Sequence, residues 1–335
     1  MKVSELGEFG LIDKVASLIY QGQQQAEVPS IKPLVGIGDD AAAFKVKGGI
    51  QLATSDCFVE GVHFTRDIAP WHAVGYRALA AALSDIAAMG GKPLYALTSL
   101  ALPEDTEVDS VVELYKGMVE VAGKYGVTLA GGDMSQAPVV ILDIAAIGQA
   151  SANKVLTRGA AKPGHKIAVT GWLGGSAAGL KMLKEGLDFD AETEISLKKA
   201  FLYPQPRLAE GQLLVKYGAA AAIDISDGLL ADLGHILKAS QVSARLEAAR
   251  IPVHPAVKAA FPELATELAL GGGEDYELLF TASETAINKI KAQAAIPVTV
   301  IGEITEGKAG DISLVDASGN PLISPEAGWE HFARQ

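Results

Sequence analysis

The chain is poor in cysteine and in aromatic residues. Of its 335 residues only Cys57 is a cysteine, and 6% are aromatic. A single thiol excludes an intramolecular disulfide framework and any zinc site built from several cysteines. The six histidines are scattered along the sequence, with no pair at the spacing of metal ligands. The chain therefore carries neither of the common zinc-binding motifs.

Long apolar runs and basic clusters are also absent from the sequence. Even the run VVILDIAAIG is interrupted by Asp143, and no run reaches the length of a membrane-spanning helix. The N-terminal segment MKVSELGEFGLIDKV lacks the basic head and long apolar stretch of a secretion signal. The 28 Lys and Arg residues form no cluster, and the net charge is −12, which disfavours a nucleic-acid surface. We therefore expect a cytoplasmic protein that binds neither membranes nor nucleic acids.

What the sequence does contain indicates a folded protein of two domains. Apolar residues make up 49% of the chain and charged residues 20%, which is typical of globular domains, and the length fits two of them. The periodicity predicts helices over residues 70–89, 107–125 and 175–184. Strands and helices alternate irregularly, which favours an α+β fold over a regular parallel sheet. A break near residues 148–154 divides the chain into domains 1–149 and 150–335, with a site expected between them.

Six short patches combine acidic residues with glycine. They are GIGDDAA (36–42), TSDCFVEGVHF (54–64), LSDIAAMG (83–90), GGDMS (131–135), DISDGL (224–229) and GGGEDYEL (271–278). Most follow a short apolar run, and we expect each to place an acid where a strand ends in a tight turn. A single patch of this kind is usually a turn or a helix cap. Six patches, two of them with adjacent acids, favour a shared site instead.

Such a set of carboxylates is typical of a magnesium–nucleotide site. Carboxylates that are brought together repel each other unless a positive charge lies between them. Magnesium prefers oxygen ligands and commonly arrives with substrate phosphates, and glycine allows backbone N–H groups to approach those phosphates closely. The sequence therefore predicts bound Mg2+ and nucleotide, although it contains no P-loop lysine motif.

One further motif, VTGWLGGSAAGL (169–180), lies between a predicted strand and a predicted helix. Its glycines do not follow the pattern G-x-G-x-x-G, and no acid ends a second strand about 20 residues later. We interpret this motif as close packing between a helix and a strand, with Ser176 near the start of the helix.

The ordered motifs resemble those of the thiamine-monophosphate kinases, in the superfamily of aminoimidazole ribonucleotide synthetase and selenophosphate synthetase. The resemblance runs from about Gly7 to Phe332, and the combination of GVHF, GGEDYEL and GWEHF points to the thiamine branch. It implies a two-domain aminoimidazole ribonucleotide synthetase-like fold. The N-terminal sheet domain would bind ATP and metal and pair in a homodimer, and the C-terminal domain would be of the α/β type. It also implies direct transfer of the γ-phosphoryl group of ATP to thiamine monophosphate through a magnesium cluster.

The resemblance also implies roles for individual residues. Magnesium and phosphate would be bound by Asp40, Thr54, Ser55, Asp56, Asp85, Asp133, Asp224 and Asp227. The nucleotide would contact Gly132, Asp133, Arg158 and Ser226, and the thiamine substrate would contact His63, Glu274 and Trp329. Asp227, Asp224 and Arg158 would act on the transferred phosphoryl group. Met134, in GGDMS, departs from the family, which usually has a hydroxyl residue directly after GGD.

Other interpretations of these residues stay open on the sequence alone. Arg158 fits a polar surface loop, His63 a half-buried strand, Trp329 a packing role at the C-terminus, and Cys57 a small buried residue. A selenophosphate synthetase would need a reactive cysteine in an N-terminal glycine-rich loop, where this chain has none. A synthetase that forms an amidine would leave GWEHF and GGEDYEL unexplained. A non-catalytic nucleotide-binding scaffold would have no need of so many carboxylates.

Overall fold

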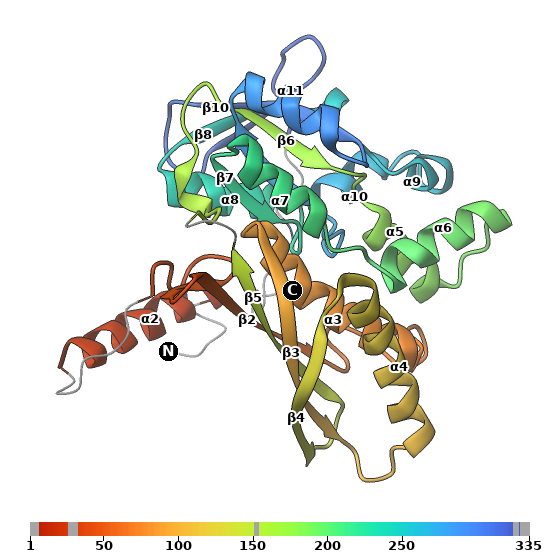
Figure 1. Cartoon of the computed structure of the whole chain (residues 1–335). Coiled ribbons are helices and arrows are strands. Elements are labelled where there is room, and N and C mark those ends of the chain that lie inside the picture. Colours follow the sequence, from red (N-terminus) through yellow and green to blue (C-terminus); the bar gives the residue numbers. More distant parts are fainter. Residues whose placement is uncertain (1–6, 26–32, 151–153, 324–327, 329–335) are drawn as a thin grey trace.

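The computed structural model describes residues 7–25, 33–150, 154–323 and 328, and it has an α+β fold (Figure 1). Its two β-sheets come from successive parts of the chain. The first part contains α2 (Glu8–Gln25), β1 (Ala42–Val46), β2 (Gly49–Val59), α3 (Trp71–Ala88), β3 (Gly91–Leu102), α4 (Val108–Tyr125), β4 (Thr128–Gln136) and β5 (Ile141–Ala150). Among the described residues, the first sheet has the strand order β1-β2-β5-β3-β4. Only the pairing of β3 with β4 in this sheet is parallel.

The second part of the chain forms the other sheet and its helices. It contains η1 (Arg158–Ala160), β6 (Lys166–Thr170), α5 (Gly175–Glu185), α6 (Ala191–Leu202), α7 (Leu208–Tyr217), β7 (Ala221–Asp224), α8 (Leu229–Ser240), β8 (Ser243–Glu247), η2 (Ala248–Arg250), α9 (Pro255–Ala260), α10 (Ala265–Gly271), β9 (Leu278–Ala282), α11 (Glu284–Gln293), β10 (Val298–Thr305) and β11 (Ile312–Val315). The strand order of this sheet within the described residues is β11-β8-β10-β6-β9-β7.

Helix α3 is the central helix of the molecule. Its alanine-rich sequence favours the helical state, and nearly all of its residues are buried. It packs against β2, β3 and β5 on one side and against α4, α7 and β7 on others. Two glycines permit the close approach of α4: a Cβ on Gly75 would lie 1.9 Å from the carbonyl oxygen of Leu114, and one on Gly117 would lie 1.9 Å from that of His72. This packing brings the C-terminal end of α3 against the end of β7.

The remaining face of the first sheet is only partly covered within the described residues. Ser55 and Cys57 on β2 and Leu97 on β3 are exposed there. The prediction that Cys57 is buried is therefore wrong, because strand alternation places it on the same face as Ser55 and away from α3.

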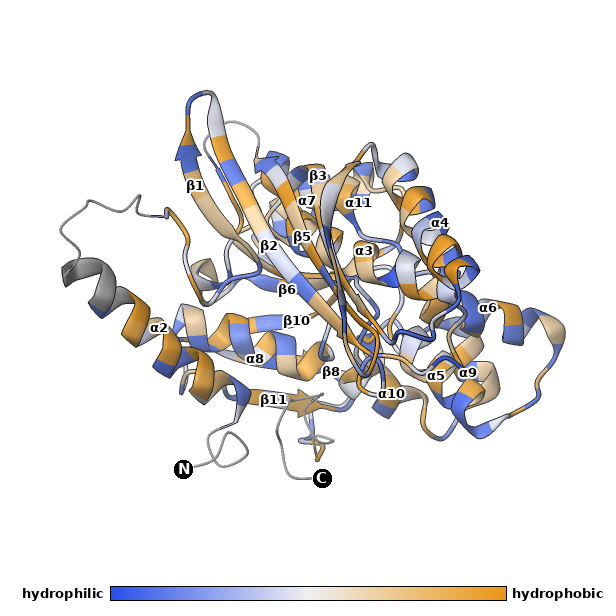
Figure 2. Ribbon diagram, turned by 90° about the horizontal axis from the view of Figure 1, so that it is seen from below, coloured by the Kyte–Doolittle hydropathy of each residue, from blue (hydrophilic) through white to orange (hydrophobic). Residues whose placement is uncertain are grey.

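Helix α2 extends to one side of the first sheet and lies beside α8 (Figures 1 and 2). The ring centroids of Phe9 and His235 lie 4.4 Å apart at this contact. Apolar and polar residues are mixed along α2 in Figure 2, and Leu18 is 71% exposed. Among the described residues, no helix is both long enough and apolar enough to cross a membrane.

The predicted helices are confirmed as α3, α4 and α5, each to within two residues at either end. The expectation that a strand ends at each acidic patch is confirmed only for DISDGL, where Asp224 ends β7, and is wrong for the other five. Asp39 and Asp40 precede β1, and Glu274 and Asp275 lie between α10 and β9. Asp56 lies inside β2, Asp85 near the C-terminal end of α3, and Asp133 inside β4, because acid–glycine patterns also fit a long strand or the last turn of a helix. The division into domains 1–149 and 150–335 stays a prediction.

Candidate active site

Three carboxylates from separate elements meet where the two sheets approach each other. Asp40 precedes β1, Asp85 lies on α3, and Asp224 ends β7; each offers an oxygen within 4.8 Å of the others. Asp40 and Asp224 are buried, and the hydroxyl of Thr54 donates a hydrogen bond to Asp85. The buried Oδ2 of Asp40 has no hydrogen-bond partner among the described residues. The cluster therefore offers several oxygen ligands, one of them unsatisfied, to a cation.

The electrostatics of this cluster also favour a bound cation. Burial and the neighbouring charge of Asp40 raise the pKa of Asp224 to about 8. Burial and the charges of Asp56 and Asp224 raise the pKa of Asp85 well above its usual value. Burial and the charges of Asp143 and Asp40 raise the pKa of Asp56 to about 6. Ionised carboxylates are thus unfavourable here without a partner, and an all-oxygen donor set fits Mg2+.

Arg158 supplies the positive charge next to this cluster. Its guanidinium forms an ion pair with Asp40, with Nε 3.2 Å from Oδ1. Asp39 instead binds backbone, since its carboxylate accepts from the N–H groups of Asp40 and Arg158 at 3.1 and 3.2 Å. Of the adjacent pair Asp39-Asp40, one acid therefore organises the turn and the other faces the cluster. Arg158 is not a free surface residue.

A cavity of about 380 Å³ adjoins the cluster through Asp56. Five of the residues predicted from sequence share its wall, and they come from both parts of the chain. The lining consists of Glu8, Asp56, Cys57, Phe58, Val62, His63, Ser176, Ala177, Leu180, Ser226, Asp227, Gly273, Glu274 and Tyr276. Nδ1 of His63 accepts from the N–H of Val59 at 3.0 Å, so a neutral His63 ring carries its proton on Nε2.

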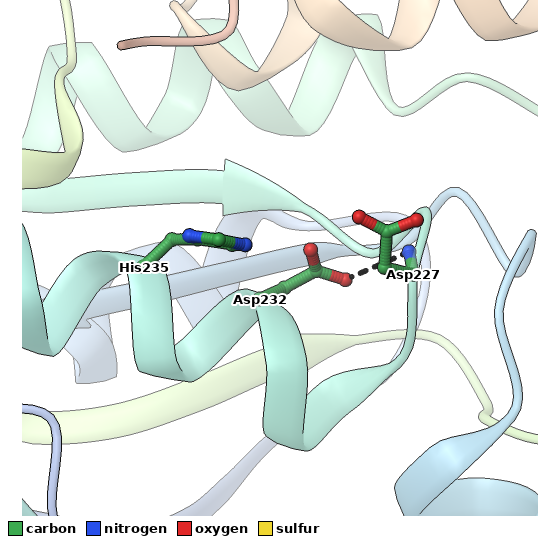
Figure 3. Close-up of side chains that lie close together, drawn as sticks. All are labelled: Asp227, Asp232 and His235. Atoms are coloured by element: carbon green, nitrogen blue, oxygen red, sulfur yellow. Dashed lines mark hydrogen bonds between the residues drawn. The ribbon is translucent and has the colours of Figure 1, made fainter. Parts of the chain in front are cut away.

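The DISDGL loop is shaped by a residue outside the motif. Asp232, in the first turn of α8, accepts from the N–H groups of Ser226, Asp227 and Gly228 at 3.1 to 3.2 Å. Figure 3 shows the hydrogen bond from Asp227. One carboxylate thus fixes the turn that presents Ser226 and Asp227 to the cavity. Asp227, Asp232 and His235 also have ligand atoms within 4.8 Å of one another. Since Oδ2 of Asp232 accepts from three backbone N–H groups, we interpret Asp232 as a residue that holds the loop and not as a metal ligand.

In the GGGEDYEL loop, one acid caps a helix and another lines the cavity. Glu274 and Tyr276 have φ angles of 63° and 51°, a region that residues with side chains rarely adopt. Asp275 accepts from the N–H groups of Gly174 and Ser176 at 2.6 and 3.1 Å, which caps α5. Asp275 therefore caps a helix, although in the sequence the adjacent acids Glu274 and Asp275 counted as evidence against a capping role. Glu274 lines the cavity.

Three other predicted residues lie away from the cluster in this chain. The hydroxyl of Ser55 binds Asp143 at 3.0 and 3.1 Å on the opposite face of β2. Gly132 and Asp133 are exposed on β4, with β5 and β3 between β4 and β2. Trp329 lies outside the described residues.

Sequence reasoning missed Arg77, Asp232 and Glu8. Arg77 had a usable signal, since it is the one Lys or Arg in the largely apolar helix WHAVGYRALAAALSDIAA; a buried cation implies a buried anion. Asp232 had none, because helices commonly begin with an acid. Glu8 lies in GEFGLI (7–12), which is one of the motifs shared with the resembled family, but the resemblance gave it no role.

Comparisons with known proteins agree with this arrangement. Residues 38–150 match the family model "AIR synthase related protein, N-terminal domain", and residues 162–315 match the corresponding C-terminal domain. The chain is 38% identical over 333 residues to thiamine-monophosphate kinase of Escherichia coli O157:H7, covering 98% of each chain. It is 36% identical to that of Bacillus subtilis strain 168, covering 89% of this chain and 93% of the relative.

The structure is similar to that of AaThiL complexed with AMPPCP and TMP, with a TM-score of 0.85, 32% identity and 99% of each chain covered. These matches cover 98% and 99% of this chain, so they include both sheets rather than one domain. The chain therefore belongs to the AIR synthase related proteins and, within them, to the thiamine-monophosphate kinase family.

Proposed function

We propose that this protein transfers the γ-phosphoryl group of ATP to thiamine monophosphate, giving thiamine diphosphate and ADP. The observation that carries the proposal is that two sites meet at Asp56. One is the carboxylate cluster with Arg158, and the other is the cavity with His63 and Glu274. A phosphoryl donor held by cations and an organic acceptor would then lie side by side. The relatives are named as kinases of this substrate.

The residues of the cluster would hold the triphosphate in place for reaction. Asp40, Asp85 and Asp224 would bind Mg2+, with Asp56 and Thr54 beside them. Mg2+ held by these carboxylates would supply positive charge to offset the charge that develops during phosphoryl transfer. The Arg158 guanidinium, oriented by Asp40, adds a fork of N–H donors for a phosphate.

The acceptor side of the site requires little acid–base chemistry. A phosphate oxygen of thiamine monophosphate is already a nucleophile, so in-line positioning and charge neutralisation suffice. Ser226 and Asp227, fixed by Asp232, would lie nearest the transferred group. His63 and Glu274 would contact the thiamine moiety, together with Trp329 as the sequence predicts.

We also propose a homodimer that pairs the exposed faces of the two N-terminal sheets. This face carries Ser55 and Asp133, and Gly132 precedes Asp133 on the same edge strand β4. These three residues are the predicted ligands that lie away from the cluster within one chain. Pairing would cover the exposed side chains of Leu97 and Cys57.

A coupled assay for ADP release tests the proposal directly. We expect turnover with Mg2+, ATP and thiamine monophosphate, thiamine diphosphate as the product by mass spectrometry, and no turnover when either Mg2+ or the acceptor is omitted. Free thiamine should be a poor acceptor, since it lacks the attacking phosphate oxygen. Equal turnover with free thiamine, or none with thiamine monophosphate, would refute the assignment.

A further inference from the structure

Arg77 is an arginine whose side chain is fully buried between the two parts of the chain. Its Nη2 donates to both carboxylate oxygens of Glu274, at 2.6 and 2.7 Å. Its guanidinium carbon lies 4.2 Å from the ring centroid of Phe201 and 5.7 Å from that of Phe58. A guanidinium that is packed between two rings in this way has little freedom to reorient. The position of the Glu274 carboxylate is therefore set from α3.

Glu274 lies between this arginine and the cavity. Its side chain is 26% exposed and lines the cavity wall, while its backbone has the φ angle of 63° described above. Because Arg77 already balances its charge, Glu274 does not act as an unpaired anion for a positively charged ring. An ionised carboxylate has about four lone-pair positions, so it can still accept a further hydrogen bond from a ligand.

The wall around Glu274 fits a flat, neutral heterocycle. Phe58, Val62 and Leu180 supply apolar surface, and Ser176 supplies a hydroxyl whose oxygen is buried and has no hydrogen-bond partner among the described residues. The first N–H groups of α5 are taken by Asp275, so this end of the cavity offers no anion site. The phosphate of the substrate then belongs at the other end, near Asp227.

We propose that Arg77 is a positioning residue that holds Glu274 as the hydrogen-bond acceptor for the amino group of the pyrimidine ring of thiamine monophosphate. This inference rests on the proposed function. It makes the aminopyrimidine, rather than the charged thiazolium, the part of the substrate that Glu274 recognises.

Two substrate analogues separate these possibilities. In oxythiamine monophosphate a carbonyl oxygen replaces the amino group, and in deazathiamine monophosphate a neutral thiophene replaces the thiazolium. We expect the wild-type protein to discriminate against the oxo analogue by about 100-fold in kcat/KM, since a buried acceptor then lacks its donor. Discrimination against the thiophene analogue should stay below about tenfold.

The variant Arg77→Met should raise KM for thiamine monophosphate at least tenfold, leave KM for ATP unchanged, and reduce discrimination against the oxo analogue to less than about tenfold. Arg77→Lys, which keeps one donor and the charge, should be intermediate. Arg207→Met is the matched control: Arg207 holds the buried Glu277 at the end of the same loop, with Nε 2.7 Å from Oε2, and neither lines the cavity. It should lower the melting temperature but keep the discrimination of the wild type.

Strong discrimination against the thiophene analogue together with weak discrimination against the oxo analogue would make Glu274 a counter-ion and overturn the proposal. Equal loss of discrimination in Arg207→Met would reduce Arg77 to a structural role and overturn it as well. Should Arg77→Met fail to fold, Arg77→Lys and Glu274→Gln supply the same comparison. A wild type that does not turn over thiamine monophosphate at all would instead refute the proposed function.

Discussion

Replacing Asp224 by Asn should stabilise the metal-free protein while impairing its binding of magnesium and nucleotide. Asp224 lies 3% exposed within reach of Asp40 and Asp85, so its charge is unfavourable in the folded chain. The amide in Asn has a similar shape and no charge. Substituting a residue that serves binding but destabilises the fold should raise folding stability and weaken ligand binding.

The size and the pH range of the effect follow from the pKa of Asp224. Burial and the charge of Asp40 raise it from 3.8 to about 8, so the unfolded chain loses this proton at lower pH than the folded chain does. The resulting penalty is absent below about pH 4, grows up to about pH 8, and is constant above. At about 1.4 kcal/mol per pH unit it reaches on the order of 5 kcal/mol. Burying an amide costs about 1–3 kcal/mol, which leaves a net gain of about 2–4 kcal/mol at pH 8.

Urea unfolding in EDTA at pH 4 and pH 8 measures this gain, with Asp105→Asn as a control for the same change at an exposed turn. We expect Asp224→Asn to be the more stable protein only at pH 8, and the control to match the wild type at both. Mg2+ with a non-hydrolysable ATP analogue at a hundredfold excess over Kd should stabilise the wild type by about 2.7 kcal/mol and the variant by much less. A variant that is less stable at pH 8, or an equal response to ligand, would refute the reasoning.

Three further predictions concern turnover, assembly and the acceptor. Asp227→Asn should reduce kcat far more than it weakens ATP binding, whereas Asp56→Asn should weaken nucleotide binding itself; equal binding losses by calorimetry would contradict this division. Light scattering at micromolar concentration should give twice the 34.8 kDa monomer mass, and a monomer mass would exclude the dimer. Trp329→Ala should raise KM for thiamine monophosphate up to about thirtyfold, for a stacking loss of about 0.5–2 kcal/mol, and an effect on KM for ATP instead would refute its assignment.

The sequence predicted the fold class and the main helices because their signals are local. In alanine-rich, periodic segments such as residues 70–89, residue propensity and spacing within the segment itself predict a helix. The elements that carry the acids were less predictable, because Asp85 on a helix and Asp56 inside a strand face one another only through the packing of α3 on β2. The sequence motifs identified the candidate carboxylates of the site, but not the packing of helices on strands that brings them together.

The contributions of Arg77 and Asp232 could not be predicted for a related reason. Each lies outside the motif that it holds: Arg77 is 197 residues from Glu274, and Asp232 is only five residues from Asp227 but follows the end of the DISDGL motif. A motif states which groups meet the ligand, while the residues that hold those groups have no required position in the sequence.

The two pairs of adjacent acids show how one short motif can both hold its own loop and present a carboxylate to the site. Asp39 and Asp275 bind backbone N–H groups, whereas their neighbours Asp40 and Glu274 pair with an arginine and face the site. Consecutive residues point in different directions, so a pair of acids can fix a loop with one carboxylate and present the other to a ligand. The same division separates Asp232 from Asp227. Half of these six acids are therefore structural, and their hydrogen bonds to backbone N–H groups hold the loops that present the other half to the site.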